Sequence, residues 1–98
     1  MNIKVFKMIS GEELIAEVIN NLPTTKTLKE PAVIVMQKTE QGIGVGMMPY
    51  MPYVSGNVSL NNSAIAAEGD PDVKLVNEYN RLFGSGIQIA SAADLPAR

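Results

Sequence analysis

The fold is decided by one stretch near the start of the chain, Gly11-Glu12-Glu13-Leu14-Ile15-Ala16-Glu17-Val18. Its second half alternates, which predicts a β-strand over 14–19 with Leu14, Ala16 and Val18 on one face. The opposite face starts with Ile15, so both faces are partly apolar. We expect one face to line the core and the other to meet a neighbouring chain.

A second strand is predicted directly before this one. The segment 3–9 is rich in Ile, Val and Phe, and the polar residues 10–13 are typical of a tight turn between antiparallel strands. The pair Phe6-Lys7 breaks the alternation, which indicates a bend or bulge.

Two further strands follow the turn residues 20–25. The apolar run 31–36 predicts a strand buried on both sides at the centre of the sheet. The next predicted strand, 43–48, has Gly42, Gly44 and Gly46 on one face, and a strand without side chains on one face can bend sharply.

A short internal repeat interrupts the pattern, Met48-Pro49-Tyr50 followed by Met51-Pro52-Tyr53. Its two prolines exclude a central strand. The last strand is either Val58 to Leu60 or Ala64 to Glu68, and we favour the second.

One helix is predicted near the end of the chain. Asp70 is the expected N-cap, Pro71 the first helical residue, and Gly84 lies just past the end, giving a helix over about 71–83. An apolar stripe follows the helical period, at Leu75, Val76, Tyr79, Leu82 and Phe83. The Ala- and Ser-rich segment 90–98 is predicted to be a loose tail.

Composition limits the class of protein. The chain has 98 residues, a net charge of -2 and 18% charged residues, which predicts one domain over 1–98 with some surface covered by other copies. It has no Cys and no His, so we expect no enzyme activity, no metal site and no cofactor. With no signal-peptide pattern and no membrane span, we expect a cytoplasmic protein.

The stretch Gly11–Val18 resembles the first sequence motif of Sm-like proteins, a group that includes the bacterial Hfq type. Gly11, Leu14 and Val18 fit that motif, and Ala16 stands where glycine is usual. A second segment, Val54-Ser55-Gly56-Asn57-Val58, is similar to the family's apolar-Arg-Gly-Asn segment before the last strand, with Ser55 in place of Arg.

Nearly the whole chain also resembles small Sm-like proteins of tailed phages of marine cyanobacteria. The resemblance runs from Ile3-Lys4-Val5-Phe6-Lys7-Met8-Ile9-Ser10-Gly11-Glu12-Glu13 to the segment from Asn77 to Gly86. It implies a mainly β fold: a strongly bent, SH3-like antiparallel barrel of about five strands over about 3–68, followed by the C-terminal helix. For a phage-encoded protein the compartment would be the host cytoplasm.

The resemblance also implies a homo-oligomeric ring. A bent open sheet has two unpaired edges, and pairing the fourth strand of one subunit with the fifth of the next removes both, in rings of about five to seven subunits. The candidate interface residues are Met47, Met48, Met51 and Ile65.

The function that the resemblance implies is binding of single-stranded RNA around the pore of that ring. Asn20 and Asn21 would supply hydrogen bonds, Lys26 and Lys29 positive charge, and Tyr50 or Tyr53 a stacking surface, and these six are the candidate RNA-binding residues. The alternative is a phage structural or assembly ring that binds protein and has no role with RNA. Packing of the tyrosines at a subunit contact and ordinary solvation of the lysines remain open.

Overall fold

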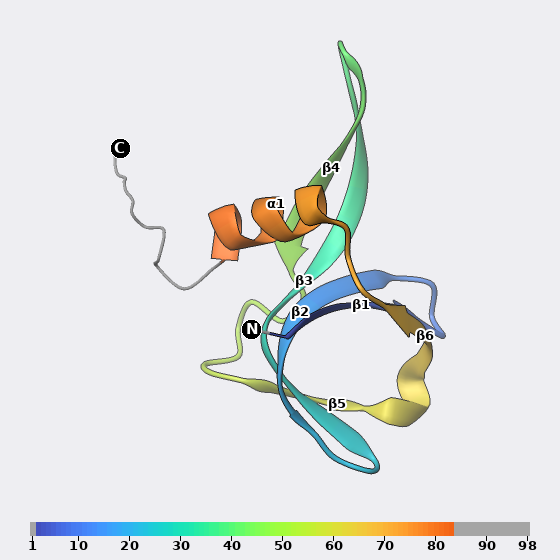
Figure 1. Cartoon of the computed structure of the whole chain (residues 1–98), viewed down its shortest axis with the longest axis vertical. Coiled ribbons are helices and arrows are strands. Elements are labelled where there is room, and N and C mark those ends of the chain that lie inside the picture. Colours follow the sequence, from blue (N-terminus) through green and yellow to red (C-terminus); the bar gives the residue numbers. More distant parts are fainter. Residues whose placement is uncertain (1, 84–98) are drawn as a thin grey trace.

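The computed structural model describes residues 2–83 (Figure 1). The elements, in chain order, are β1 (Ile3–Met8), β2 (Glu13–Asn21), β3 (Thr25–Thr39), β4 (Gly42–Pro49), β5 (Val58–Asn61), the 3-10 turn η1 (Asn62–Ala64), β6 (Ile65–Gly69) and α1 (Val73–Phe83). The chain is thus mainly β with one C-terminal helix, as the sequence predicts. Both alternatives for the last strand are strands, β5 and β6, so the sheet has six strands.

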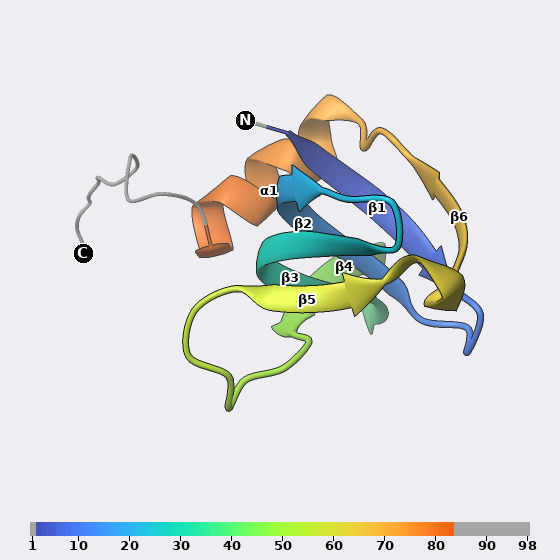
Figure 2. The ribbon, with the colours of Figure 1, turned by 90° about the horizontal axis from the view of Figure 1, so that it is seen from below.

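The strands form one antiparallel sheet in the order β4-β3-β2-β1-β6, and β5 pairs with β3. Within residues 2–83 no ladder joins β6 to β4 or β5, so the sheet curls but does not close. Figure 2 shows the curl, with β5 alongside the first half of β3 and β6 rising beside β1. The irregularity predicted at Phe6-Lys7 is wrong for β1, because both residues pair regularly with β2 and alternate in burial. The β1–β6 register shifts one residue later, between Lys7 and Met8, where Ala66 of β6 is the extra residue.

The long strand β3 consists of two halves with different partners. Its first half, Thr25 to Leu28, pairs with β5, and its second half, Ala32 to Thr39, pairs with β4. Between the halves, Glu30 and Pro31 lie opposite the single residue Ala16 of β2, which is a β-bulge. Glu30 has a φ of 52°, in the left-handed region that non-glycine residues seldom adopt.

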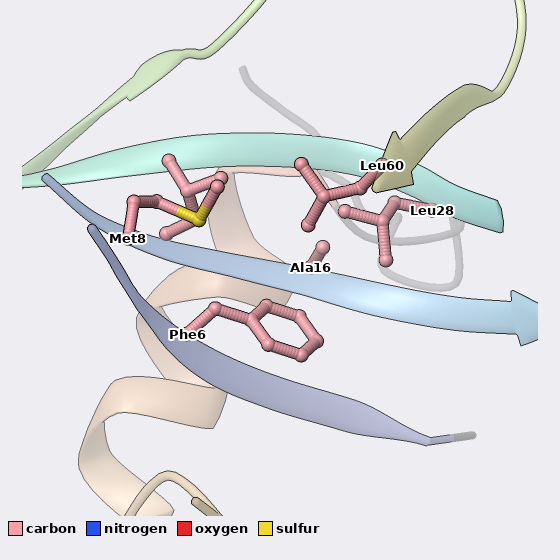
Figure 3. Close-up of a cluster of buried hydrophobic side chains, with 6 residues drawn as sticks. Phe6, Met8, Ala16, Leu28 and Leu60 are labelled. Carbon is pink, nitrogen blue, oxygen red and sulfur yellow. The ribbon is translucent and has the colours of Figure 1, made fainter. Parts of the chain in front are cut away.

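The core lies on the concave side of the curl (Figure 3). It contains six buried residues from four strands: Phe6, Met8, Leu14, Ala16, Leu28 and Leu60. Leu14 and Ala16 come from the predicted inward face of β2, and Val18 packs against the cluster, which confirms that face.

Helix α1 covers part of the opposite face of the sheet. Tyr79 of α1 is buried with Ile15 and Ala32, and Leu75 and Phe83 pack beside them. The prediction that Ile15 meets a neighbouring chain is therefore wrong, because the chain's own helix covers it. The predicted burial of 31–36 is also only partly correct: Ala32 is buried, whereas Met36 is 74% exposed.

The helix begins later than predicted. Asp72 Oδ1 accepts a hydrogen bond from the Leu75 N–H at 2.8 Å, so Asp72 is the N-cap and the assignment of Asp70 is wrong. Asp70 instead forms an ion pair with Lys4, at 2.6 Å. The predicted helix stop at Gly84 and the tail 90–98 lie outside the described residues.

Candidate functional site

The turn between β2 and β3 meets η1 at one end of the curled sheet. Asn62 Nδ2 donates to the carbonyl oxygens of Leu22 and Pro23, both at 3.2 Å. The Asn62 backbone N–H donates to the Thr24 carbonyl at 2.9 Å. Three hydrogen bonds from one residue therefore fix η1 against the turn, although the two segments are far apart in sequence.

Lys26 extends into the junction of these segments. Its Nζ donates to Asn21 Oδ1 at 3.0 Å and to Asn62 Oδ1 at 3.1 Å, and it lies 3.8 Å from Glu68 Oε1. Only 8% of Lys26 is exposed. A buried ammonium needs such oxygen partners, because leaving one unpaired is costly. Asn21, Lys26, Asn62 and Glu68 are together called the turn cluster below.

The turn cluster leaves amide donors at the surface. Asn21 offers its side-chain oxygen to Lys26, and within residues 2–83 its NH2 group has no hydrogen-bond partner. Asn20 is exposed beside it. Amide groups of this kind hydrogen-bond the edges of unstacked bases or phosphate oxygens. The cluster thus combines a fixed backbone with free amide donors.

The structure brings two of the six predicted RNA-binding residues into contact, Asn21 and Lys26, which pair in the β2–β3 ladder. Asn20 pairs with Thr27, so its side chain lies on the opposite face of the same hairpin end. Lys29 is exposed farther along β3, opposite Glu17. The tyrosines lie in the loop between β4 and β5. Tyr50 packs against the core cluster, whereas Tyr53 is 99% exposed.

The four predicted interface residues also form two groups, two exposed and two packed against buried clusters. Met48 and Met51 are exposed at and just after the end of β4. Met47 packs against the cluster under α1, and Ile65 packs against the main core. Met51 also lines a pocket of ≈ 240 Å³ between the loop 50–57 and the bulge at Glu30 and Pro31.

Tyr79 connects α1 to the bulge. Its hydroxyl lies 2.9 Å from the carbonyl oxygens of both Lys29 and Glu30, and it accepts a hydrogen bond from the Glu17 N–H at 3.2 Å. The one hydroxyl proton is shared between the two carbonyls. Burial raises the pKa of Tyr79 from 10.0 to about 12, so the phenol keeps its proton under ordinary conditions. This side chain positions β3 and has no free polar atom for chemistry.

Two members of the turn cluster, Asn62 and Glu68, are missing from the sequence-based candidates. The run Asn61-Asn62-Ser63 is turn chemistry between two short strands and could have indicated a tight turn. It does not indicate which other turn this one meets, since that depends on the curl of the sheet. Glu68 carries no local signal at all.

Among residues 2–83 no group of three or more acidic side chains is placed to hold a metal ion, and no helix has the length and apolar character needed to cross a membrane. No protein-family model and no curated protein matches the chain.

Proposed function

We propose that this protein is a ring-forming scaffold of the Sm-like type that binds single-stranded RNA at the turn cluster. The observation that supports this function best is the convergence of two turns, held by Asn62, around exposed amides and a lysine. The protein binds rather than catalyses, because the chain has no His or Cys to act as base or nucleophile.

The strand order supports the ring. β6 stands at one end of the order, while β4 and β5 stand at the other, each paired on one side only. Edge strands present unpaired N–H and C=O groups, and pairing β6 with the β4 or β5 edge of a second copy satisfies both. A head-to-tail contact of this kind closes when the rotation between copies divides a full turn. A barrel-like wall then continues from copy to copy.

A ring repeats the turn cluster once per subunit. Several weak contacts, one set from each copy, then act on one strand of RNA, which raises its overall affinity without any single strong site. Tyr53 adds an exposed ring on which a base could stack, worth about 1–3 kcal/mol. The amides of Asn20 and Asn21 supply the hydrogen bonds to base edges.

Native mass spectrometry of the full chain, alone and with short U-rich and A-rich oligonucleotides, tests this function. We expect one discrete ring mass that increases by one oligonucleotide, with an affinity that falls as salt rises. Asn21→Ala removes the free amide of the turn cluster, so it should weaken binding at least several-fold and leave the ring intact. The matched control is Asn77→Ala, because Asn77 is exposed on α1, outside the turn cluster.

A monomer in solution would contradict the ring. A ring that binds no oligonucleotide, or an affinity unchanged in Asn21→Ala, would contradict RNA binding at the turn cluster while leaving the ring in place.

A second candidate function, an assembly ring that binds protein, is favoured by two specific observations. The ammonium of Lys26 is already held by Asn21, Asn62 and Glu68, which reduces its attraction for phosphate. In addition, four large apolar side chains are exposed in and beside the loop 50–57, namely Met48, Met51, Tyr53 and Val54. A ring that binds no RNA would support this second function.

A further inference from the structure

The hairpin of β3 and β4 extends past helix α1 (Figure 1). Its cross-strand pairs Ile34–Met47, Met36–Val45 and Lys38–Ile43 place these six side chains on one face. That face continues the surface under α1, where Ile34 and Met47 pack beside Tyr79. The distal part is not covered within residues 2–83: Met36, Ile43 and Val45 are all exposed, Met36 to 74% and Ile43 to 71%.

A groove runs from this apolar face along α1 and across the sheet. It has a volume of ≈ 490 Å³, and its apolar lining residues are Val5, Ile34, Met36, Val45 and Leu75. A second pocket of ≈ 360 Å³ shares Val5 and Leu75 with it and continues the groove toward β6. An apolar hollow of this size beside an exposed apolar hairpin is unusual on an isolated monomer and marks an interaction surface.

The charges of the groove and of the hairpin are complementary. Glu13 and Asp72 line the groove and, among residues 2–83, neither forms an ion pair; Lys74 lines it too, so carboxylates outnumber ammonium groups two to one. The hairpin carries Lys38 at its tip, on the same face as Met36 and Ile43. One chain therefore carries both an apolar hairpin face that bears the ammonium of Lys38, with Glu40 in the turn beyond it, and an apolar groove that bears more carboxylates than ammonium groups.

We propose that a second copy of this chain occupies the groove, with the hairpin faces packed against each other around a two-fold axis. Met36, Ile43 and Val45 of each copy then cover the open part of the groove of the other. The tip Lys38 of each copy lies near Glu13 and Asp72 of its partner. A two-fold contact suits a surface that is complementary to itself.

This contact is separate from the ring contact of the proposed function. It uses a face of the sheet, whereas the ring uses the strand edges, so both can form together. In that case two rings pack face to face and the subunit number doubles. If the strand edges do not pair, the same contact gives a simple dimer.

Analytical ultracentrifugation and native mass spectrometry, from low micromolar to near-millimolar protein, test the proposal on the full chain. We expect the wild type to reach twice the subunit number of its smallest assembly. Met36→Lys should weaken this doubling about tenfold or more, because it would bury an unpaired ammonium. The matched control is Gln37→Lys, the adjacent residue on the opposite face of the same strand, which should leave the doubling unchanged.

Charge reversal provides a second test that does not depend on apolar burial. Lys38→Glu alone and Glu13→Lys alone should each weaken the doubling several-fold, and the double variant should restore it. Both residues are exposed, so the variants should fold, which circular dichroism can confirm.

A wild type that never doubles would overturn the proposal, as would equal behaviour of Met36→Lys and Gln37→Lys or a double variant that fails to recover. Failure of the ring has a different signature: a wild type that changes only between monomer and dimer, with the dimer lost in Met36→Lys, excludes the ring and supports the hairpin contact.

Discussion

The two halves of β3 have the same strand conformation and opposite environments. The first half, Thr25 to Leu28, is partly polar, yet Lys26 and Leu28 are buried where β5 pairs alongside it and the sheet curls over the core. The second half is the more apolar, yet exposure increases along it until Met36. Apolar composition therefore indicates that a strand needs cover, but the curl of the sheet and the position of α1 decide where the chain itself provides it.

The largest effect on stability is expected at Leu28, in the covered first half of β3. Leu28→Ala should lower the free energy of unfolding by about 2–5 kcal/mol, since the side chain is completely buried in the main core. Met36→Ala, in the exposed half of the same strand, should change it by less than about 0.5 kcal/mol. Urea denaturation of both variants, at a concentration where each has the same subunit number, measures the difference. Equal losses would show that the second half is also enclosed.

A smaller effect is expected at the junction of the halves, where Tyr79 holds the bulge. Tyr79→Phe leaves the carbonyls of Lys29 and Glu30 without this donor and should lower the free energy of unfolding by about 1–3 kcal/mol. Tyr53→Phe is the control, because Tyr53 is 99% exposed and should lose nothing. Thermal unfolding of the two variants shows whether the loss of stability is specific to the buried Tyr79 hydroxyl or follows from removing any tyrosine hydroxyl.

Burial of the Tyr79 hydroxyl gives this site a pH signature as well, because burial raises the pKa of the phenol. The folded pKa is raised to about 12 from 10.0, so the folded state keeps its proton where the unfolded chain loses it. The contribution is complete below pH 10 and disappears between pH 10 and 12, by about 1.4 kcal/mol per pH unit. Other groups titrate in this range, so the measured quantity is the difference between wild type and Tyr79→Phe. A difference independent of pH over this range would contradict the assignment.

Local pattern was enough for much of the fold. Alternation in Leu14–Val18 predicted the inward face of β2, and the single helix was recognised from its stripe. What failed was the identity of the neighbour: Ile15 was expected to meet another chain and meets α1, since a sequence shows that a face is apolar and not what covers it. The N-cap moved from Asp70 to Asp72 because both are suitable capping residues and Lys4 pairs with Asp70.

The candidate site was predictable only in part, for a related reason. Asn21 and Lys26 are five residues apart across one turn, so hairpin pairing alone brings them together. Asn62 and Glu68 reach the same point only because β5 pairs with the first half of β3 and β6 returns beside β1. This meeting depends on the curl of the sheet, to which the bulge at Glu30 contributes a bend in β3. The sequence gives no sign of that bulge, because its left-handed position is occupied by Glu30 and not by glycine.

The smallest predicted effect tests whether that bulge is strained. Glu30 has a φ of 52°, and a residue with a Cβ is disfavoured there by about 1–2 kcal/mol. Glycine avoids this cost, but its larger loss of chain entropy on folding offsets part of the gain. Glu30→Gly should therefore be more stable than Glu30→Ala by about 0.5–1 kcal/mol, and the alanine variant controls for loss of the carboxylate.

The combination with Tyr79 decides how the bend between the two halves of β3 is maintained. If the Tyr79 hydroxyl holds a strained bulge, Tyr79→Phe should cost less in the Glu30→Gly background than in the wild type, and a double-mutant cycle on urea midpoints measures this coupling. Equal costs in both backgrounds would mean that packing of Leu28 and Ala32 on either side fixes the bend, and that the hydroxyl only satisfies carbonyls which the bend has already exposed.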